Sequence, residues 1–277
     1  MPAPADYYHG CRAPALPIPD NILLFCRHSA AELHDGSLQP HFHHRWVLVI
    51  PLAGAGTVLV DENQYPLRPG QTLLIPPLRL HRYRDVEGGK ICWLYVTFEW
   101  PGVEAEAAVP ELGVLSPAAQ RHLKAVLPLW RARPSEPVAA AELAAETALL
   151  LLTVRRTPPT AAALPAAPAA ELLHKINDWL QTHRAEPVVL ARLARDIGCS
   201  ESRLRALFRQ HFGITLGRYV RETRCRQAAL RLRDGGVTVT EVAAAFGFSS
   251  VYTFSRTFKR VLGFAPSTLR SAANRHS

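Results

Sequence analysis

Cysteine is scarce in this sequence, and the few cysteines present are poorly placed to crosslink the chain or to bind zinc. They are odd in number, scattered, and never in a Cys-x-x-Cys spacing: Cys11, Cys26, Cys92, Cys199 and Cys225. Neither a disulfide framework nor a zinc finger is therefore indicated. Reduced thiols are typical of the cytosol.

Signals for export or membrane insertion are also lacking. The first residues, MPAPADYYHG, contain no basic region followed by an apolar core. No uninterrupted apolar run approaches the roughly 18 residues that a bilayer span requires. We therefore expect a soluble, cytoplasmic protein with no membrane partner.

Acidic residues are few in the second half of the chain, where basic residues outnumber them. Residues 1–169 contain 14 Lys+Arg and 15 Asp+Glu, a net of −1, whereas residues 170–277 contain 18 and 8, a net of +10. The whole excess of +9 therefore belongs to the C-terminal part. A localised positive field favours a polyanionic partner such as nucleic acid, although basic surfaces also serve solubility.

At 277 residues the chain is long enough for two domains. Residues 1–20 are rich in proline and alanine and predict an extended arm. Residues 21–154 form the first predicted domain. Residues 155–169, again dense in proline and alanine, predict a semi-rigid linker, and residues 170–277 form the second domain.

Short apolar runs separated by turn signals dominate residues 22–99, among them NILLFC, RWVLVIPL, GTVLVDE, QTLLIPP and ICWLYVTF. That spacing indicates an all-β barrel or sandwich. In PLRPGQTLLIPPLRLHRY, a Pro-Gly turn leads into a buried strand, Pro76-Pro77 ends it, and His81 begins the next strand.

This segment, together with the cluster HFHH at 41–44, resembles the cupin fold, in which two such segments face one another inside a small barrel. Metal-binding cupins use two histidines and a glutamate from the first segment and a histidine from the second. Here His41, His43 and His81 match three of these places, but Arg45 and the residues after it stand where the glutamate is expected. Three imidazoles can hold Zn²⁺ or Fe²⁺, yet histidine is equally a polar group of ligand pockets.

Strict alternation along RWVLVI places Trp46, Leu48 and Ile50 on one face and Val47 and Val49 on the other. We expect one face to line the interior, where aromatic rings and imidazoles would contact a small molecule or simply fill the core. The candidate effector-pocket residues are His41, His43, Trp46, His81, Tyr83, Trp93 and Tyr95.

Two helices should follow the strands. The first is predicted to begin after Ser116 as N-cap, with Pro117 at its first position. The second is expected from about Val138 to Val154 and contains four consecutive leucines, Leu149 to Leu152. Such surplus apolar surface indicates either burial against the sheet domain or a partner helix, which a second subunit could supply.

The stretch from about Val188 to Arg270 contains one helix-turn-helix pattern twice, at about 188–213 and 238–263. The copies are LARLARDIGCSESRLRALFRQHFG and TEVAAAFGFSSVYTFSRTFKRVLG, with equivalent residues 49 apart before the turn and 50 apart after it. Each has a short helix with small residues, a glycine turn and a capped second helix. Two such units in tandem are a strong signal.

Periodicity predicts which side chains of each second helix face outward. In the first unit, Leu204, Leu207 and Phe208 should point to the core. In the second, Phe254, Phe258 and Val261 should do so. The outward side chains are then Ser202, Arg205, Ala206 and Arg209 in the first unit and Tyr252, Thr253, Arg256 and Lys259 in the second.

Residues 171–270, and GFSSVYTFSRTFKRVLGFAPSTLR above all, resemble the AraC/XylS family of bacterial transcription regulators. The resemblance implies a seven-helix domain whose long central helix joins two helix-turn-helix units, each inserting a helix into one of two successive major grooves. Carried over by position, the base readers would be Ser202, Arg205, Tyr252, Thr253 and Arg256. The phosphate contacts would be Arg209, Arg218, Arg221, Lys259 and Arg260. Ala206 replaces a larger polar residue, so the first unit is expected to read fewer bases.

The sequence as a whole therefore predicts an α+β protein: a cupin-like β-barrel with two helices, followed by an all-α DNA-binding domain. Its expected role is a transcription regulator, not an enzyme, whose first domain senses a small molecule such as a sugar or another carbon-source metabolite. A metal-dependent cupin enzyme with a DNA-binding appendage, or a first domain that only dimerises, are the alternatives. Expected partners are double-stranded DNA, an effector, a second copy of the chain and RNA polymerase at the nucleoid. No cofactor is expected.

Overall fold

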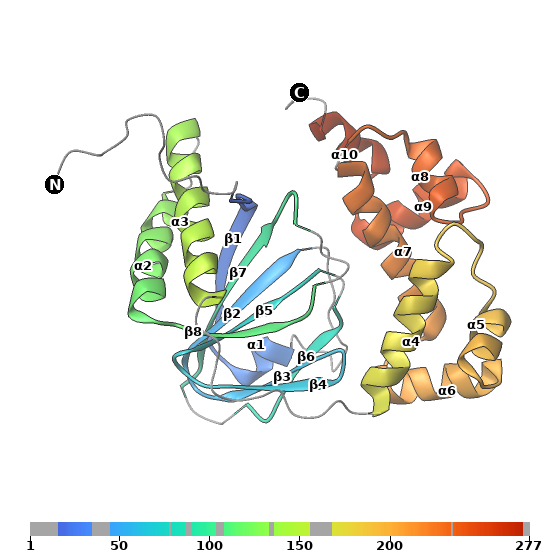
Figure 1. Cartoon of the computed structure of the whole chain (residues 1–277), viewed down its shortest axis with the longest axis horizontal. Coiled ribbons are helices and arrows are strands. Elements are labelled where there is room, and N and C mark those ends of the chain that lie inside the picture. Colours follow the sequence, from blue (N-terminus) through green and yellow to red (C-terminus); the bar gives the residue numbers. More distant parts are fainter. Residues whose placement is uncertain are drawn as a thin grey trace, which may run out of the picture.

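The computed structural model describes residues 16–34, 45–77, 79–86, 90–103, 108–132, 136–155, 168–233 and 235–273. Within these ranges a sheet-rich N-terminal part is followed by a helical C-terminal part, and the two lie side by side (Figure 1). This order confirms the predicted fold class. Most of the predicted arm and linker lies outside the described residues.

The N-terminal part contains two antiparallel sheets. The larger has the strand order β1-β7-β2-β5-β8, formed by Asp20–Arg27, Cys92–Glu99, Trp46–Ala53, Gln71–Ile75 and Glu111–Val114. The smaller has the order β4-β3-β6, formed by Asn63–Leu67, Gly56–Val60 and His81–Arg84. In the described part of the chain no strand ladder joins the two sheets, so the predicted barrel is a sandwich of two facing sheets.

Both faces of the larger sheet are buried, which explains why its central strands are almost continuously apolar. Val47 and Val49 point toward the smaller sheet and share a core with Val58 and Val60. Trp46, Leu48 and Ile50 point the other way, into a second core that also contains residues of two helices. The predicted alternation along this strand is thus confirmed.

Two helices, α2 (Pro117–Arg131) and α3 (Pro137–Arg155), cover the outer face of the larger sheet, whereas the short α1 (Ala30–His34) lies beside β1 and β6 (Figure 1). Ser116 caps α2 as predicted, accepting a 3.2 Å hydrogen bond from the Ala119 amide. Such a cap contributes about 1 kcal/mol.

By length and composition α3 is apolar enough to cross a membrane, and 33% of its most apolar window is buried inside the protein. Leu150 and Leu151 are buried against the sheet, and Glu146 bonds to His122 of α2 at 2.8 Å. Leu149 and Val138 are 37% and 70% exposed. Burial against the sheet therefore accounts for part of the predicted surplus apolar surface, and the rest faces outward.

The described C-terminal part consists of seven helices, α4 to α10: Pro168–Thr182, Leu190–Ile197, Glu201–Phe212, Leu216–Arg233, Val239–Ala245, Val251–Leu262 and Pro266–Ala273. The long helix predicted from about Leu216 to Leu232 is α7, whose 18 residues give a rod of about 27 Å. It lies between the group α4, α5 and α6 and the group α8, α9 and α10 (Figure 1).

The helical part has two cores that share α7. Leu216, Tyr219 and Val220 of its first half pack with α4, α5 and α6. Ala228 and Leu232 of its second half pack with α8 and α9. Each helix-turn-helix unit thus has its own core, and one helix joins them.

Candidate nucleic-acid interface

The first helix-turn-helix unit, α5 and α6, is held by the local signals that its sequence contains. Gly198 ends α5 in the left-handed conformation, with φ of +89°, which glycine adopts without a steric penalty. The Ser200 side chain then accepts a hydrogen bond from the Arg203 amide and starts α6. Buried Leu204 and Phe208 fix the rotation of α6 about its axis.

That rotation leaves Ser202, Arg205, Ala206 and Arg209 exposed, as the periodicity predicts. Arg205 is paired with Glu201 one turn earlier, through hydrogen bonds of 2.8 and 2.6 Å. An exposed ion pair contributes at most about 1 kcal/mol. Arg205 can therefore exchange this partner for a base or a phosphate at little cost.

The second unit, α8 and α9, is capped more completely. The Thr238 side chain and Glu241 bond to each other's backbone amides in a capping box. Ser250 caps α9, accepting from the Thr253 amide at 3.1 Å and bonding to the Thr253 hydroxyl at 3.0 Å. Phe254 and Phe258 are fully buried beneath α9. Its orientation is thus set by both its start and its core.

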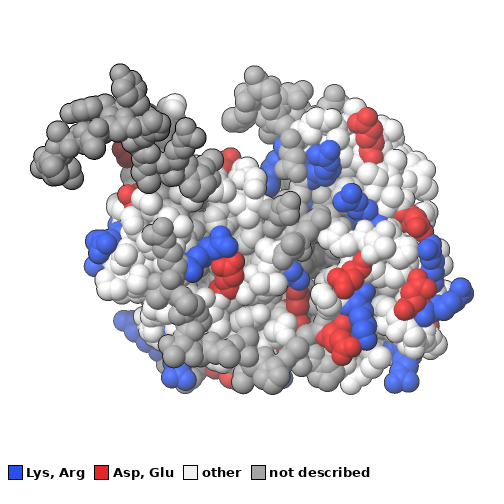
Figure 2. All heavy atoms as spheres, viewed as in Figure 1, with Lys and Arg blue, Asp and Glu red and all other residues white. Residues whose placement is uncertain are grey.

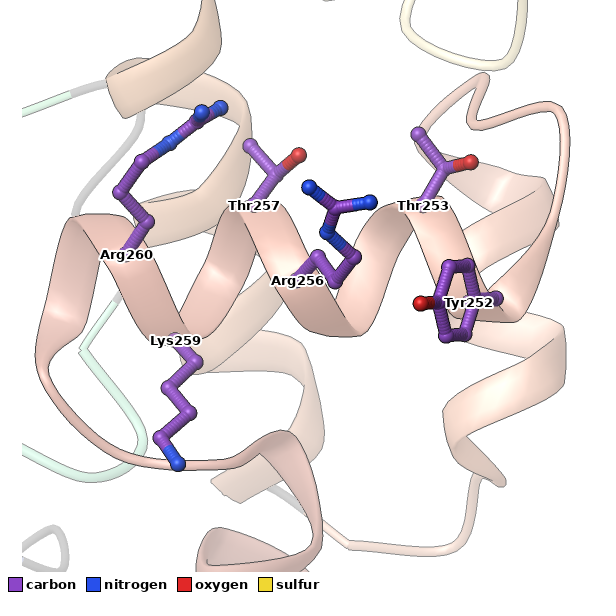
Figure 3. Close-up of a pocket in the computed structure, with 6 residues that line it drawn as sticks. All are labelled: Tyr252, Thr253, Arg256, Thr257, Lys259 and Arg260. Atoms are coloured by element: carbon purple, nitrogen blue, oxygen red, sulfur yellow. The ribbon is translucent and has the colours of Figure 1, made fainter.

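The exposed face of α9 carries a shallow, basic hollow of about 540 Å³ (Figure 3). The Arg256 guanidinium stands between Thr253 and Thr257 and lies 5.7 Å from the centroid of the Tyr252 ring. The full lining is Tyr252, Thr253, Arg256, Thr257, Lys259 and Arg260. Hydroxyl groups, an aromatic ring and cations are the groups that contact base edges and phosphates.

Thr257 is a member of this lining that the sequence analysis missed. Thr257 is only 7% exposed and lies beside the buried Phe258, so its position in the sequence looks like that of a core residue. Its position four residues after Thr253, on the same helix face, is the signal that could have found it.

The residues predicted to contact phosphate lie on three helices. Arg209, Lys259 and Arg260 are exposed near the ends of α6 and α9, and Arg221 is exposed on α7. Arg218 bonds to Glu222 at 2.7 Å. In the view of Figure 2, basic side chains on the helical half are interspersed with acidic ones. The excess of positive charge is therefore not displayed as one continuous patch on this face.

Four of the predicted effector-pocket residues lie close together between the two sheets. His81 and Tyr83 come from β6, and Trp93 and Tyr95 from β7. The Tyr83 ring makes edge contacts with the other three, at centroid distances of 6.4, 5.9 and 6.2 Å. Phe25, which the sequence analysis missed, stacks on Tyr95 at 5.0 Å. These rings form an aromatic cluster inside the sandwich.

Burial leaves a polar atom of this cluster without a partner. The Trp93 indole N–H has no hydrogen-bond partner in the described part of the protein, whereas the Tyr95 hydroxyl interacts with the Tyr83 hydroxyl. Desolvation raises the pKa of Tyr83 to about 12 and that of Tyr95 well above its usual value, so both phenols are neutral donors. An unpaired buried donor costs about 1–3 kcal/mol, and a ligand oxygen would relieve this cost.

One predicted pocket residue, Trp46, needs correction, and two others, His41 and His43, remain untested. Trp46 lies on the opposite face of the larger sheet, in edge contact with Trp100 at 5.3 Å, so it is separated from the aromatic cluster. His41 and His43 lie outside the described residues, and the three-histidine arrangement stays a prediction. Among the described residues, no group of His, Cys, Asp or Glu could hold a metal ion.

Among the described residues, two contacts join the sheet domain to the helical domain. At the first, Leu80 is 2% exposed and belongs to the same core as Ala169 and Leu173 of α4 and Tyr219 of α7. Asp61 supports it by accepting hydrogen bonds from the Leu80 amide at 2.9 Å and from Arg79 at 3.1 Å. Leu80 immediately precedes His81 of the aromatic cluster.

At the second place, Glu99 at the end of β7 and Arg233 at the end of α7 form an ion pair of 2.7 Å. Both side chains are largely buried, with 13% and 24% exposed. The two contacts involve opposite halves of α7. They therefore attach the sheet domain to both halves of α7, the helix that joins the two units.

Comparison with known protein families matches both halves of the chain. Residues 25–152 match the AraC-like ligand binding domain. Residues 193–272 match the helix-turn-helix domain.

Curated relatives align with most of this chain and with most of their own length. The HTH-type transcriptional activator RhaS of Pectobacterium carotovorum is 25% identical over 246 residues, covering 84% of this chain and 88% of its own. The HTH-type transcriptional activator RhaR of Escherichia coli is 27% identical over 245 residues, covering 83% and 86%. Among solved structures, ToxT of Vibrio cholerae O395 is 11% identical, with a TM-score of 0.42 over 92% of this chain and 95% of that one.

Proposed function

The chain belongs to the AraC family of transcriptional regulators, with a ligand-binding domain followed by a helix-turn-helix domain, and from this we propose how it binds DNA and how a ligand controls that binding. We propose that α6 and α9 enter two successive major grooves on one side of the duplex. We place the two domains at residues 21–154 and 170–277.

The observation that carries the proposal is the pair of capped helices, each with its own core and an exposed polar face, joined by one rod of about 27 Å. With the units packed at its ends, this rod brings the two helices near the roughly 34 Å that separate successive grooves. The proposed base readers are Ser202, Arg205, Tyr252, Thr253 and Arg256. The proposed phosphate contacts are Arg209, Arg218, Arg221, Lys259 and Arg260.

We propose that the effector binds at the aromatic cluster between the sheets. A ligand with several hydroxyl groups, such as a sugar or another carbon-source metabolite, would offer oxygen acceptors to the unpartnered Trp93 indole N–H and would bond to the buried Tyr83–Tyr95 hydroxyl pair. Because Leu80 precedes His81 and lies in the core of the first unit, a shift of β6 on ligand binding would reach α4 and α7 directly. Ligand occupancy would in this way change the DNA affinity.

A thermal-shift screen of sugars and other carbon-source metabolites against the full chain tests this role. A ligand at 100 times its dissociation constant stabilises the folded protein by about 2.7 kcal/mol. The expected result is a hit whose shift is lost in Tyr95→Phe and whose presence changes DNA affinity. If every stabilising ligand leaves DNA affinity unchanged, the proposed regulation is wrong.

Further partners follow from the same proposal. The two relatives named above are called transcriptional activators, which supports activation as the outcome. We propose contact with RNA polymerase at the nucleoid, in the cytoplasm, as its route. The exposed Leu149 and Val138 of α3 support a homodimer, which sedimentation of the full chain would detect. We infer that the chain acts by binding and not as an enzyme. A stoichiometric metal with substrate turnover would instead favour a cupin enzyme.

A further inference from the structure

A buried arginine lies where the two helix-turn-helix units meet. Arg224 is near the middle of α7, between the residues that pack in the first core and those that pack in the second. It is only 5% exposed. Burial lowers the pKa of its guanidinium, with the nearby Glu186 opposing that shift. A charge is rarely buried in this way unless its hydrogen bonds are made.

The two hydrogen bonds that Arg224 makes go to the loop before the first unit, while its buried Nε has no partner among the described residues. Its Nη2 donates to the carbonyl oxygens of His183 and Glu186, at 3.0 and 2.7 Å. Both residues lie in the loop between α4 and α5. That loop is itself fixed, because the His183 ring stacks on Trp179 at 4.2 Å and the Trp179 indole donates to Asp196 of α5 at 2.7 Å.

The turn between α8 and α9 of the second unit lies against the same loop, because Glu186 is the nearest neighbour of Gly247; Figure 1 shows where α8 and α9 lie. Gly247 in this turn has φ of +68°, and a Cβ atom built on it would lie 2.3 Å from the Glu186 carbonyl oxygen and 2.8 Å from Arg224 Nη1. The Gly247 turn therefore lies against both the loop backbone at Glu186 and the Arg224 guanidinium. We call Arg224, the loop 183–186 and Gly247 the interunit bracket.

The bracket matters because one shared helix fixes two rigid bodies poorly. With α7 alone, bending or twisting of the rod would change the angle between α6 and α9. A second connection to one side of the α7 axis prevents that movement. On DNA, one added base pair separates two half-sites by a further ~3.4 Å and rotates them by about 35°, so the angle between the helices determines which spacing fits.

We propose that the interunit bracket sets the spacing between the two DNA half-sites that this protein accepts, with Arg224 as a positioning residue that itself touches no base. The inference rests on the proposed binding of both α6 and α9 to DNA. It predicts a change in spacing preference without a change in the bases preferred within each half-site.

The chain contains a matched control for this test. Gly198 occupies the equivalent turn of the first unit, and its φ of +89° imposes the same backbone strain on alanine, yet no atom lies within 4 Å of an added Cβ. Gly198→Ala and Gly247→Ala therefore differ in the contact between units. Arg224→Lys keeps the charge but loses the guanidinium, whose Nη2 donates to both carbonyl groups and whose Nη1 lies against the Gly247 turn.

The experiment selects binding sites from a random DNA library with the full-length wild type, Gly198→Ala, Gly247→Ala and Arg224→Lys, each first shown by circular dichroism to be folded. Wild type and Gly198→Ala should select two half-sites at one spacing. Gly247→Ala and Arg224→Lys should select the same half-sites over at least two spacings. Insertion of one base pair between the half-sites should weaken wild-type binding. The fold-loss of affinity should be at least 10 times larger for wild type than for Gly247→Ala and Arg224→Lys.

The outcomes separate the bracket from the function on which it rests. A wild type that selects a two-part site, with both bracket variants keeping its single spacing, would overturn the role of the bracket while leaving the DNA-binding mode intact. Changed base preferences within a half-site would also overturn it. A wild type that selects no two-part site would overturn the proposed DNA-binding mode and the bracket with it.

Discussion

Replacing Arg256 by alanine separates base reading from general attraction to DNA. The guanidinium is exposed on α9 and lies 5.7 Å from the Tyr252 ring centroid. Such an exposed cation–π contact contributes only ~0.5–1 kcal/mol to the free protein, so the variant should fold normally. A bidentate contact with guanine is worth about 1–3 kcal/mol of discrimination. Loss of that contact should therefore weaken specific binding about 5- to 150-fold.

The assay compares the dissociation constants of the full chain for a selected site and for random duplex DNA, over a series of salt concentrations. Arg256→Ala should lower the ratio of the two constants. Arg260→Ala, one helical turn further along α9, is the matched control because Arg260 is predicted to contact phosphate. It should weaken both complexes alike and reduce the magnitude of the slope of log K against log salt by about 0.9.

Arg256→Lys sharpens the comparison, since lysine keeps the charge but lacks the guanidinium fork. It should lose specificity almost as fully as alanine does while binding random DNA nearly as well as wild type. Equal losses on specific and random DNA for Arg256→Ala would refute base reading by this residue.

Three further predictions concern two buried contacts of the sheet domain and one exposed ion pair on α6. Leu80→Ala empties a buried position shared with α4 and α7, and it should lower the free energy of unfolding by about 2–5 kcal/mol. The control Leu52→Ala, at a 44% exposed position, should change that free energy little. Denaturant titration measures both variants. Burial raises the pKa of Asp61 above its unfolded value despite Arg79, so the free energy of unfolding should fall as pH rises from about 4 through the folded pKa. Asp61→Asn, followed by calorimetry against pH, should lose that dependence. Glu201→Gln removes the ion-pair partner of Arg205 and should strengthen DNA binding up to about 5-fold. When Glu201→Gln is added to Arg205→Ala, DNA binding should not become stronger.

Each of these has a clear contrary result. Equal stability losses in Leu80→Ala and Leu52→Ala would show that the sheet domain is not docked through Leu80. An unchanged pH profile in Asp61→Asn would assign the titration to another group. A gain from Glu201→Gln that persists in the Arg205→Ala background would come from charge alone.

The helical domain could be predicted closely because its signals are local. The cap residues Ser200 and Ser250 and the spacing of Phe254 and Phe258 fix where α6 and α9 begin and which face is outward. Every residue predicted to face outward on these helices is exposed. Their roles as base and phosphate contacts stay predictions.

The sheet domain was less predictable because alternation gives two faces without saying what covers each one. Trp46 and Trp93 were placed in one pocket, yet Trp46 packs toward α2 and α3 while Trp93 faces the smaller sheet. Both faces are equally apolar, so composition could not separate them. Phe25 was missed for the same reason, although it lies in the strand run NILLFC.

Contacts between distant segments left no sequence signal at all. Leu80 looks like any apolar residue at a strand start, and its partners on α4 and α7 are about 90 or more residues away. Gly198 and Gly247 are equivalent in the two repeats and have similar backbone angles, but only Gly247 lies against another segment. Such differences arise from tertiary packing and could be found only in the structure.

The measurement that tests the central claim most directly is a hydroxyl-radical footprint of the full chain on a selected DNA site. If α6 and α9 both enter major grooves of one duplex, each monomer should protect two patches on the same face, centred about 10 base pairs apart. A single patch per monomer, patches on opposite faces, or no protection at low salt would contradict that claim.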